Sequence, residues 1–516
     1  MIMKRRDFVK LSTLSAGFAL GKVPVWAQNL PSMPELEDRI LVIIQMFGGN
    51  DGLNTVIPAD NDLYYSKFRK SLNIPKNKTI KLGNSNAYLH PSLNSGPGNG
   101  LSGLFKEGKV AVLQGVGYPN PNLSHFRSTD IWLSGKVPSA DSERLESGWI
   151  GSYLSSKGIA GTGEHPDCLN IGSNSSLIFR HNAENFGLSV SDPVQFYESG
   201  KDLLTGDSFV DGSSKYASEF NYLLDLSIKS NKYSKVVKDA FDKGKNTQDY
   251  SNDGLVSELK LVARLISGGL KTKVYLLNIN GFDTHAAQGT TDGKHAALLK
   301  SVNDSIAWFM ADLKAQNLSK NVVGMTISEF GRRPNENESG GTDHGAAGAM
   351  FVFGDEVKGG LYGNNFDFSK LDSNGDFIHQ FDYRAVYDEI LFKWMGGSDT
   401  AIKSVLQKRY SHIQGGILND YLATGSPLAN DVPTNNTVFP NPTTDGFITL
   451  NLNLPQPDNI TLFQTTLSGQ RLSVFQNIPL PTGTHSLPVQ LKNGRGNYIL
   501  EVLGGNIRES FKVIWI

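Results

Sequence analysis

The stretch ILVIIQMFGGND, residues Ile40 to Asp51, contains the pattern that decides the fold of this chain. Its first seven residues are apolar apart from Gln45, which is typical of a strand buried on both faces of a parallel sheet. Two glycines then turn the chain, and after Asn50 comes the carboxylate of Asp51. The stretch therefore predicts a buried strand whose carboxyl end presents Asp51.

The same pattern recurs along the middle of the chain. Further apolar runs cover Val110 to Val116, Lys273 to Ile279 and Val322 to Ser328. Between and after them, apolar residues recur at helical spacing within Leu299 to Leu313 and Val386 to Trp394. Strands that alternate with helices predict an α/β fold, with a doubly wound, mostly parallel sheet covered on both faces.

Length and composition limit the function classes. The chain has 516 residues, a formal net charge of −1 and a single cysteine, Cys168. The length predicts more than one domain, and the balanced charge argues against a nucleic-acid partner. One cysteine excludes an intramolecular disulfide and a cysteine-rich zinc site. Any metal must therefore be held by His, Asp or Glu.

The first residues have the pattern of an export signal. Lys4, Arg5 and Arg6 precede a short apolar stretch, and Ala27 ends a small-residue cleavage site, so residues 1–27 are predicted to be a twin-arginine-type signal peptide. The alternative is an amphipathic N-terminal helix. No other run approaches about 20 apolar residues, so no stable transmembrane segment is expected. Twin-arginine export carries folded proteins, which weakly favours a metal cofactor.

The character of the sequence changes after the middle region, residues 38–424. Residues 425–436 are polar and proline-bearing, as in a linker, and residues 437–516 alternate as in a small all-β sandwich. The motifs VFPNP, LSGQRL and GNYILEV in that segment resemble the type A sorting domain of the type IX secretion system. The resemblance implies export machinery as a partner and delivery through the periplasm to the cell surface or beyond. The alternative is a carbohydrate-binding or adhesive β-module.

Polar residues gather where the four predicted strands end. Parallel strands bring their carboxyl ends to one edge, so these residues are expected to form one site. Carboxylate and imidazole ligands suit zinc, manganese or iron better than calcium. Four converging strand ends are the geometry that a two-metal hydrolase needs. The residues are Asp51, then Ser124 and His125, then Asp283 and His285, and finally Glu329, Arg332, Asp343 and His344.

Each of these residues also has an ordinary structural explanation. Asp51 alone is expected to cap a turn or helix, and His125 alone to pack or to face solvent. Glu329 alone is expected to pair with Arg332 or Arg333. Only their joint occurrence after four strands favours a site.

Five segments of the chain resemble, in order, the family called domain of unknown function 1501. That family is usually placed in the alkaline phosphatase and sulfatase superfamily, which implies an α/β fold of alkaline phosphatase type for residues 38–424. The segments are FGGNDGLNTVIP (Phe47 to Pro58), SHFRSTDIW (Ser124 to Trp132), GFDTHAAQ (Gly281 to Gln288), SEFGRRPNENESGGTDHG (Ser328 to Gly345) and DYRAVYDEIL (Asp382 to Leu391).

The superfamily resemblance implies particular site residues. Its nucleophile would fall on Ser124, with Ser128 and Thr129 nearby. Its late third histidine has only His379 as a counterpart, with Asp382 and Glu329 as alternatives. Its metal ligands would be Asp51, Asp283, His285, Asp343 and His344.

These assignments lead to a hypothesis about function. A divalent metal, zinc or manganese, activates Ser124 against a phosphate or sulfate ester of a small molecule or polysaccharide, while Arg127 or Arg332 holds the ester oxygens. The C/S-x-P-x-R signature of sulfatases does not occur around Ser124 or Cys168, which favours phosphate. The alternative is a non-catalytic surface-binding protein that keeps the hydrolase fold.

Overall fold

The computed structural model describes residues 34–515, except residues 35, 141, 159–162, 174, 183, 202–214, 252, 420–435, 455–456, 467–470, 493 and 504–507. The predicted signal peptide and the predicted linker, apart from its last residue Asn436, lie outside the described residues. The chain divides into two compact units, residues 1–419 and 420–516. Among the described helices, none is both long and apolar enough to span a membrane.

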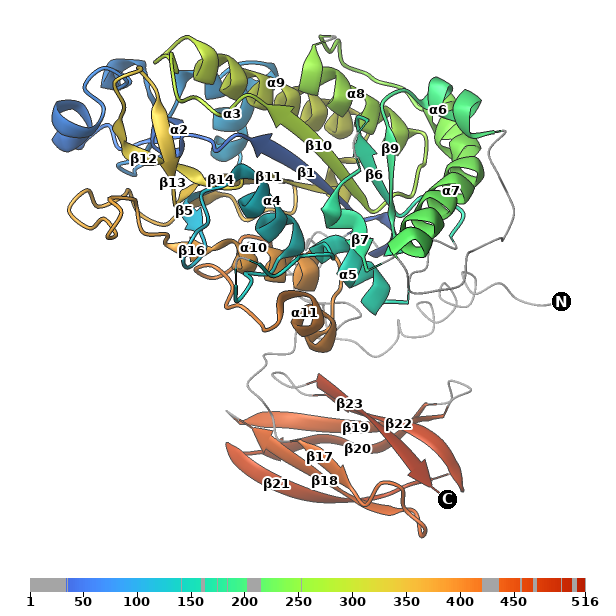
Figure 1. The fold of residues 1–516 in the computed structure, drawn as a ribbon. Helices are drawn as coiled ribbons and strands as arrows, with labels where there is room; N and C mark the ends of the chain where they lie inside the picture. Colours follow the sequence, from blue (N-terminus) through green and yellow to red (C-terminus); the bar gives the residue numbers. More distant parts are fainter. Residues whose placement is uncertain are drawn as a thin grey trace. The chain divides into compact units, whose positions relative to one another are not determined.

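One mixed sheet organises the first unit (Figure 1). Strand β14 runs antiparallel to both of its neighbours, and the other described pairings of this sheet are parallel. In order the strands are β15 (Gly360–Tyr362), β5 (Val110–Gly117), β14 (Gly348–Gly354), β11 (Val322–Ile327), β1 (Ile40–Phe47), β10 (Val274–Asn280), β6 (Cys168–Ile171) and β9 (Gly187–Val190), with β16 (Phe381–Asp382) beside β5.

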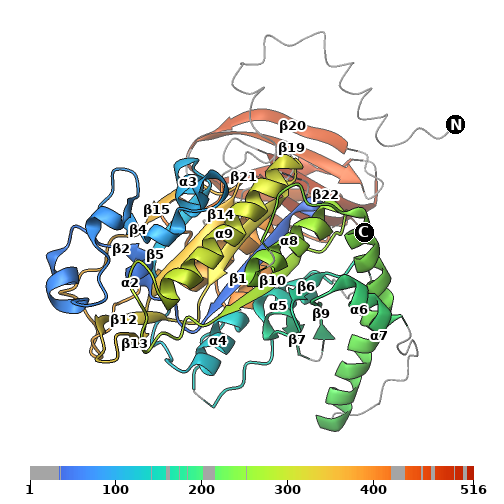
Figure 2. The same cartoon turned by 90° about the horizontal axis from the view of Figure 1, so that it is seen from above.

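Helices cover both faces of this sheet because its strands are apolar on both faces. In β1, Leu41 and Ile43 pack into one core while Val42 and Ile44 pack into the other, as the two-residue period of a strand requires. Figure 2 shows one covering layer lying across the strands. That layer contains α3 (Gly100–Lys106), α8 (Gly254–Ser267) and α9 (Lys294–Ala315).

The opposite layer contains α4 (His125–Ser134), α5 (Trp149–Ser156), α10 (Tyr383–Glu389), the π-helix η9 (Ile390–Trp394) and α11 (Asp399–Leu406). Aromatic rings dominate its core: Trp132 stacks on Tyr383 and Trp149 on Tyr387, each pair with ring centroids 4.3 Å apart. The α/β class with a mostly parallel, doubly covered sheet is therefore confirmed. All four predicted strands are present, although β14 separates β5 from β11.

Smaller elements complete the first unit. Helices α6 (Pro193–Gly200) and α7 (Lys215–Lys243) lie near the β9 edge of the sheet in both views (Figures 1 and 2). The hairpin of β12 (Gly331–Glu336) and β13 (Thr342–Gly345) follows β11. The remaining α-helix and strands of the unit are short: α2 (Gly52–Thr55), β2 (Val56–Ile57), β3 (Ile80–Lys81), β4 (Tyr88–Leu89), β7 (Arg180–His181) and β8 (Glu184–Asn185).

The second unit consists of two antiparallel sheets around their own core. Side chains that alternate along the strands, such as Leu450, Leu462 and Leu500, are fully buried in that core. One sheet contains β17 (Thr437–Phe439), β18 (Phe447–Leu454) and β21 (Gly483–Gln490); the other contains β20 (Arg471–Leu480), β19 (Asp458–Thr466), β22 (Gly496–Leu503) and β23 (Arg508–Trp515).

Candidate metal centre

The candidate centre is built from turns that follow β1, β5, β10 and β11. The turn after β1 requires glycine at Gly48, where φ is +122° and a Cβ atom would lie 2.2 Å from the backbone nitrogen of Asp283. This close approach brings the β1 and β10 turns together. Both turns then lie beside the start of α4 and the β12–β13 hairpin, at the carboxyl edge of the parallel strands.

His125, the first residue of α4, is held by a buried carboxylate. Its Nδ1 lies 2.7 Å from Oε1 of Glu329, which also accepts a 2.8 Å hydrogen bond from the backbone of Gly48. A carboxylate can only accept, so Nδ1 carries the proton and Nε2 carries a lone pair. That Nε2 atom is buried, has no hydrogen-bond partner and lies 3.5 Å from Oδ2 of Asp283.

His344, in β13, is oriented in the same way by a backbone carbonyl. Its Nδ1 donates a 2.8 Å hydrogen bond to the carbonyl oxygen of Leu123, which leaves a lone pair on Nε2. That atom lies 3.4 Å from Oδ1 of Asp283. Burial lowers the pKa of His344, which favours the neutral ring that a metal ion needs.

Asp283 completes a group of three ligand atoms. Partial burial opposes its ionisation, but the hydrogen bond and charge of Arg332 hold the pKa of Asp283 at about 2. One ligand atom each from His125, Asp283 and His344 lie within 4.8 Å of one another. Two imidazoles and a carboxylate with a solvent-open side are the donor set of a catalytic zinc site. The residues therefore fit a divalent ion.

His285 and Asp343 lie on the exposed side of this group. The carboxylate of Asp343 accepts 3.0 Å hydrogen bonds from Nδ1 of His285 and from Nδ2 of Asn337, and the Asn337 contact leads the causes that lower the pKa of Asp343. The other ring nitrogen of His285 then lies 2.9 Å from Nε2 of His344. With both Nδ1 atoms donating, two lone pairs face each other, and such a contact requires a proton or a cation.

Asp51 is placed differently from the other predicted metal ligands. It is fully buried, and Arg69 binds both of its carboxylate oxygens at 2.5 and 2.9 Å. Gln288 donates a further 2.6 Å hydrogen bond, and Asp51 also caps α2 through the backbone of Asn54. Burial raises its pKa, but Arg69 outweighs that effect and the pKa of Asp51 is lowered. Its charge is thus already compensated by protein groups.

Both predicted anion-binding arginines are bound to other protein groups. Arg332 is buried, and its guanidinium donates to backbone carbonyls, including those of Gly49 at 2.8 Å and Thr342 at 2.7 Å, and to the carboxylate of Asp283. Arg127 donates to the backbone carbonyls of Ala140 and Glu143. Arg332 thus ties together the turns that carry the centre.

Ser124 and His379 are both near strand ends but differ in their relation to the cluster. Ser124 is exposed and lies directly before His125, the first residue of α4. Its hydroxyl makes no capping hydrogen bond to the backbone of this helix. His379 packs against the end of β5, near Gly117, and burial lowers its pKa. Among the described residues, His379 is outside the group of converging ligand atoms.

Sequence patterns alone did not identify His125 as a metal ligand or Glu329 as its hydrogen-bond partner. In isolation a histidine at the start of a helix and a glutamate before two arginines have ordinary explanations. The superfamily resemblance predicts Glu329 as an alternative ligand, whereas in the structure its carboxylate accepts a 2.7 Å hydrogen bond from His125. The sequence signal that could have found them is their position. Each follows a predicted strand: His125 comes directly after Ser124, and Glu329 comes shortly before Arg332.

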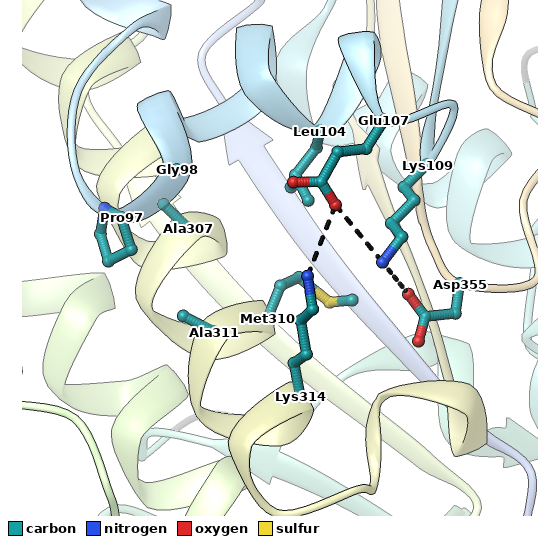
Figure 3. A pocket seen from close by; sticks show the side chains of 10 residues that line it. All are labelled: Pro97, Gly98, Leu104, Glu107, Lys109, Ala307, Met310, Ala311, Lys314 and Asp355. Carbon is teal, nitrogen blue, oxygen red and sulfur yellow. Dashed lines mark ion pairs between the residues drawn. The ribbon is translucent and has the colours of Figure 1, made fainter.

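A cavity of about 170 Å³ lies away from this cluster, between α3 and α9 (Figure 3). Its charged side chains pair with one another: Lys109 bonds Asp355 at 2.8 Å, and Lys314 lies 3.7 Å from Glu107. Lys109 precedes β5, so the cavity is at the opposite edge of the sheet from the cluster. The cavity is therefore separate from the candidate centre.

Comparison with known families gives one match. The family model described as "Protein of unknown function (DUF1501)" matches residues 111–388. The matched range includes the segments that carry His125, Asp283, His285 and His344, whereas Asp51 lies before it. No curated protein matches the sequence.

Several solved structures resemble the chain at low identity. A Bacteroides thetaiotaomicron protein described under the metabolism of multiple glycosaminoglycans is 11% identical, with 88% of this chain and 90% of that chain covered and a TM-score of 0.33. A protein in the alkaline phosphatase superfamily from Vibrio parahaemolyticus is 10% identical, with coverages of 99% and 88% and a TM-score of 0.32. A mutant of the alkaline phosphatase PafA is 10% identical, with coverages of 59% and 64% and a TM-score of 0.28. These values are too low to transfer an activity or a residue role.

Proposed function

Since the chain belongs to the DUF1501 family, whose description assigns no activity, we propose from its own residues that it is a metal-dependent hydrolase of phosphate or sulfate esters. The proposed ligands are His125, Asp283 and His344, with zinc or manganese as the ion. Asp51 is left out of this set because Arg69 already compensates its charge. His379 is left out because its ring is not among the converging ligand atoms.

One observation carries the proposal. The hydrogen bonds at Nδ1 of His125 and His344 fix both rings in the tautomer that leaves a lone pair on Nε2, and both Nε2 atoms converge with Asp283. Partners of this kind are the usual outer contacts of metal-binding histidines. A bound divalent ion would supply positive charge that stabilises the anionic transition state of ester cleavage.

The start of α4 suits an anionic substrate. The helix begins at His125, so the free backbone N–H groups of its first turn and its positive dipole end lie at the cluster. These groups replace Arg127 and Arg332 in the proposed role of binding the ester oxygens. Ser124, directly before the helix, remains the proposed nucleophile because its hydroxyl is exposed and does not cap the helix.

His285 and Asp343 are proposed to move protons. The Asp343 carboxylate orients the ring through Nδ1, and Nε2 of His285 faces the cluster. The ring is 44% exposed, so it can exchange protons with solvent. In this role His285 accepts the proton from the Ser124 hydroxyl as Oγ bonds the phosphorus or sulfur, and gives it to the alcohol oxygen as the substrate's ester bond breaks. It then accepts a proton from the water that cleaves the Ser124 ester, which releases the phosphate or sulfate and returns the serine.

The test is metal analysis together with turnover. The mature protein is expected to contain about one equivalent of zinc or manganese per chain and to hydrolyse a nitrophenyl phosphate or sulfate ester. The His125→Ala and His344→Ala variants should lose both properties and keep the wild-type circular dichroism spectrum. Metal-free protein that shows no turnover after incubation with either ion contradicts the proposal.

A non-catalytic surface-binding protein is the second candidate. The engagement of Arg332 favours it, because its buried guanidinium already donates to backbone carbonyls and to Asp283. Stoichiometric metal without turnover on either class of ester would support this candidate.

We also propose that the protein is exported. Residues 1–27 would be a twin-arginine signal, 38–424 the hydrolase-like domain, 425–436 a linker and 437–516 a sorting domain recognised by the type IX machinery. Support comes from the signal-like sequence and from the separate β-sandwich unit. Cell fractionation with the Arg5→Lys, Arg6→Lys variant tests this: retention of the variant in the cytoplasm is expected, and unchanged export of the variant would exclude the twin-arginine route.

A further inference from the structure

The three-stranded sheet of the second unit has an outer face without ionisable side chains. Along β18, Ile448, Leu450 and Leu452 point into the core, so the residues between them point outward. All residues of this outer face are within the described part of the unit. They are Thr437 and Phe439 on β17, Phe447, Thr449, Asn451 and Asn453 on β18, and Thr484, Ser486, Pro488 and Gln490 on β21.

Two phenylalanines stand out from this face. Phe439 is 70% exposed and Phe447 is 52% exposed. Phe439 is paired with Thr449, and Phe447 precedes Thr449 by two residues, so both rings are on the same face. Neighbouring rows on one face are about 6.8 Å apart. Grouped exposed apolar rings of this kind mark binding surfaces.

A row of hydrogen-bonded polar side chains, one from each strand, lies next to the row that contains Phe439. The amide of Asn451 donates a 3.2 Å hydrogen bond to Oγ1 of Thr437, and its oxygen accepts a 2.7 Å hydrogen bond from Oγ of Ser486. The row thus crosses all three strands, with the Asn451 amide held in one orientation. Hydroxyl and amide groups with both donor and acceptor capacity are therefore presented beside the aromatic rings.

We propose that this face binds a neutral polysaccharide. A pyranose ring has an apolar face of C–H groups and a rim of hydroxyls, which match the exposed rings and the Thr437–Asn451–Ser486 row. The lack of charge on the face gives no attraction to anionic glycans. This binding site is independent of the metal centre and of the proposed ester hydrolysis.

The size of the face favours a linear glycan over a protein partner. A stable protein interface takes roughly 20–30 residues from each side. The outer face offers ten side chains in four rows. A single extended sugar chain needs only such a strip, and successive sugar units can lie on successive rows.

The experiment measures binding of the full chain to a panel of polysaccharides. Affinity electrophoresis is run in gels with β-glucan, xylan, mannan, alginate or chondroitin sulfate, and pull-down uses cellulose and chitin. We expect retention by at least one neutral polysaccharide. In the Phe439→Ala, Phe447→Ala double variant, and in Asn451→Ala, affinity should fall at least tenfold.

The matched control is Ile499→Ala on β22, in the other sheet, where the side chain is 38% exposed. This variant should bind as the wild type does. The proposal is overturned if the wild type binds none of the neutral polysaccharides, if the double variant binds unchanged, or if anionic glycans bind more tightly than neutral ones. A double variant that loses self-association instead of glycan binding would show that a second copy covers the face, which also overturns it. Ester hydrolysis and metal content are expected to be unaffected in every variant.

Discussion

Asp51 and Asp283 follow neighbouring parallel strands, yet the fold gives them opposite surroundings. Asp51, after β1, is fully buried against Arg69, whereas Asp283, after β10, is 47% exposed among three imidazoles. Both carboxylates have lowered pKa values, each beside an arginine. The comparison shows that a carboxylate after a strand becomes a ligand candidate only where its oxygens also face imidazole nitrogens, as in Asp283, and not where protein donors bind both oxygens, as in Asp51.

Breaking the buried pair should have the largest effect. In Asp51→Asn, Arg69 stays buried without its counter-charge, and the free energy of unfolding is expected to fall by about 3–5 kcal/mol. Urea unfolding measures this. The matched control is Asp60→Asn, which removes the partner of Lys76 in an exposed pair and should leave the unfolding midpoint unchanged. Equal stability of Asp51→Asn and wild type would contradict the comparison.

The acid dependence of the same variant follows from the lowered pKa of Asp51. A carboxyl group with a lowered folded pKa contributes stability above its unfolded pKa and loses it as pH falls through the folded value. Asp51→Asn should therefore lose less stability than wild type between pH 4 and the acid limit of folding. A steeper acid loss in the variant would argue that Arg69 does not stabilise the charged form.

The second effect concerns metal affinity. Asp283→Asn removes the anionic ligand and should weaken zinc binding by about 100-fold or more, roughly 2.7 kcal/mol. Titration against a chromophoric chelator measures it. Any Asp51→Asn protein that remains folded should bind zinc as the wild type does. If Asp51→Asn instead loses zinc and Asp283→Asn keeps it, the proposed ligand set is wrong.

A smaller effect is expected from the support of His125. Glu329→Gln keeps a hydrogen-bond acceptor but removes the negative charge, so zinc affinity should fall by about 10–100-fold. The visible spectrum of the cobalt-substituted protein gives a second readout of ligand geometry. Glu258→Gln on α8, whose carboxylate is not among the converging ligand atoms, serves as the control. An unchanged affinity and cobalt spectrum in Glu329→Gln would remove Glu329 from its positioning role.

The smallest expected effect concerns the stability contributed by His295, which lies in the buried surroundings of Asp51. Burial lowers the pKa of His295, which bonds Asn50 beside Asp51, to about 3. The neutral ring contributes stability above pH 6.5, and this contribution is lost as pH falls toward the folded value. His295→Gln should therefore lose about 1.4 kcal/mol less than wild type between pH 7.5 and 5.5. Parallel stability curves for the two proteins would contradict the buried neutral ring.

Sequence patterns predicted the strands better than the partners of their polar residues. The apolar run of β1 and the helical spacing of apolar residues in α9 are local properties. Consecutive residues show whether a strand is buried on both faces or a helix on one side. The pairing of Asp51 with Arg69 is not a local property, since Arg69 lies 18 residues away in a segment without a recognisable motif. The antiparallel insertion of β14 between β5 and β11 likewise left no local signal.

The sequence by itself determined the α/β class, the four strands and the set of Asp and His residues at the carboxyl edge of the sheet. Only the tertiary structure decided which of these residues share a centre. It brought His125 next to Asp283 and His344, and it enclosed Asp51 and Arg332 in protein hydrogen bonds. The physical reason is that side-chain periodicity follows from neighbours in the chain, whereas ring tautomer and charge compensation depend on donors and acceptors supplied by distant segments.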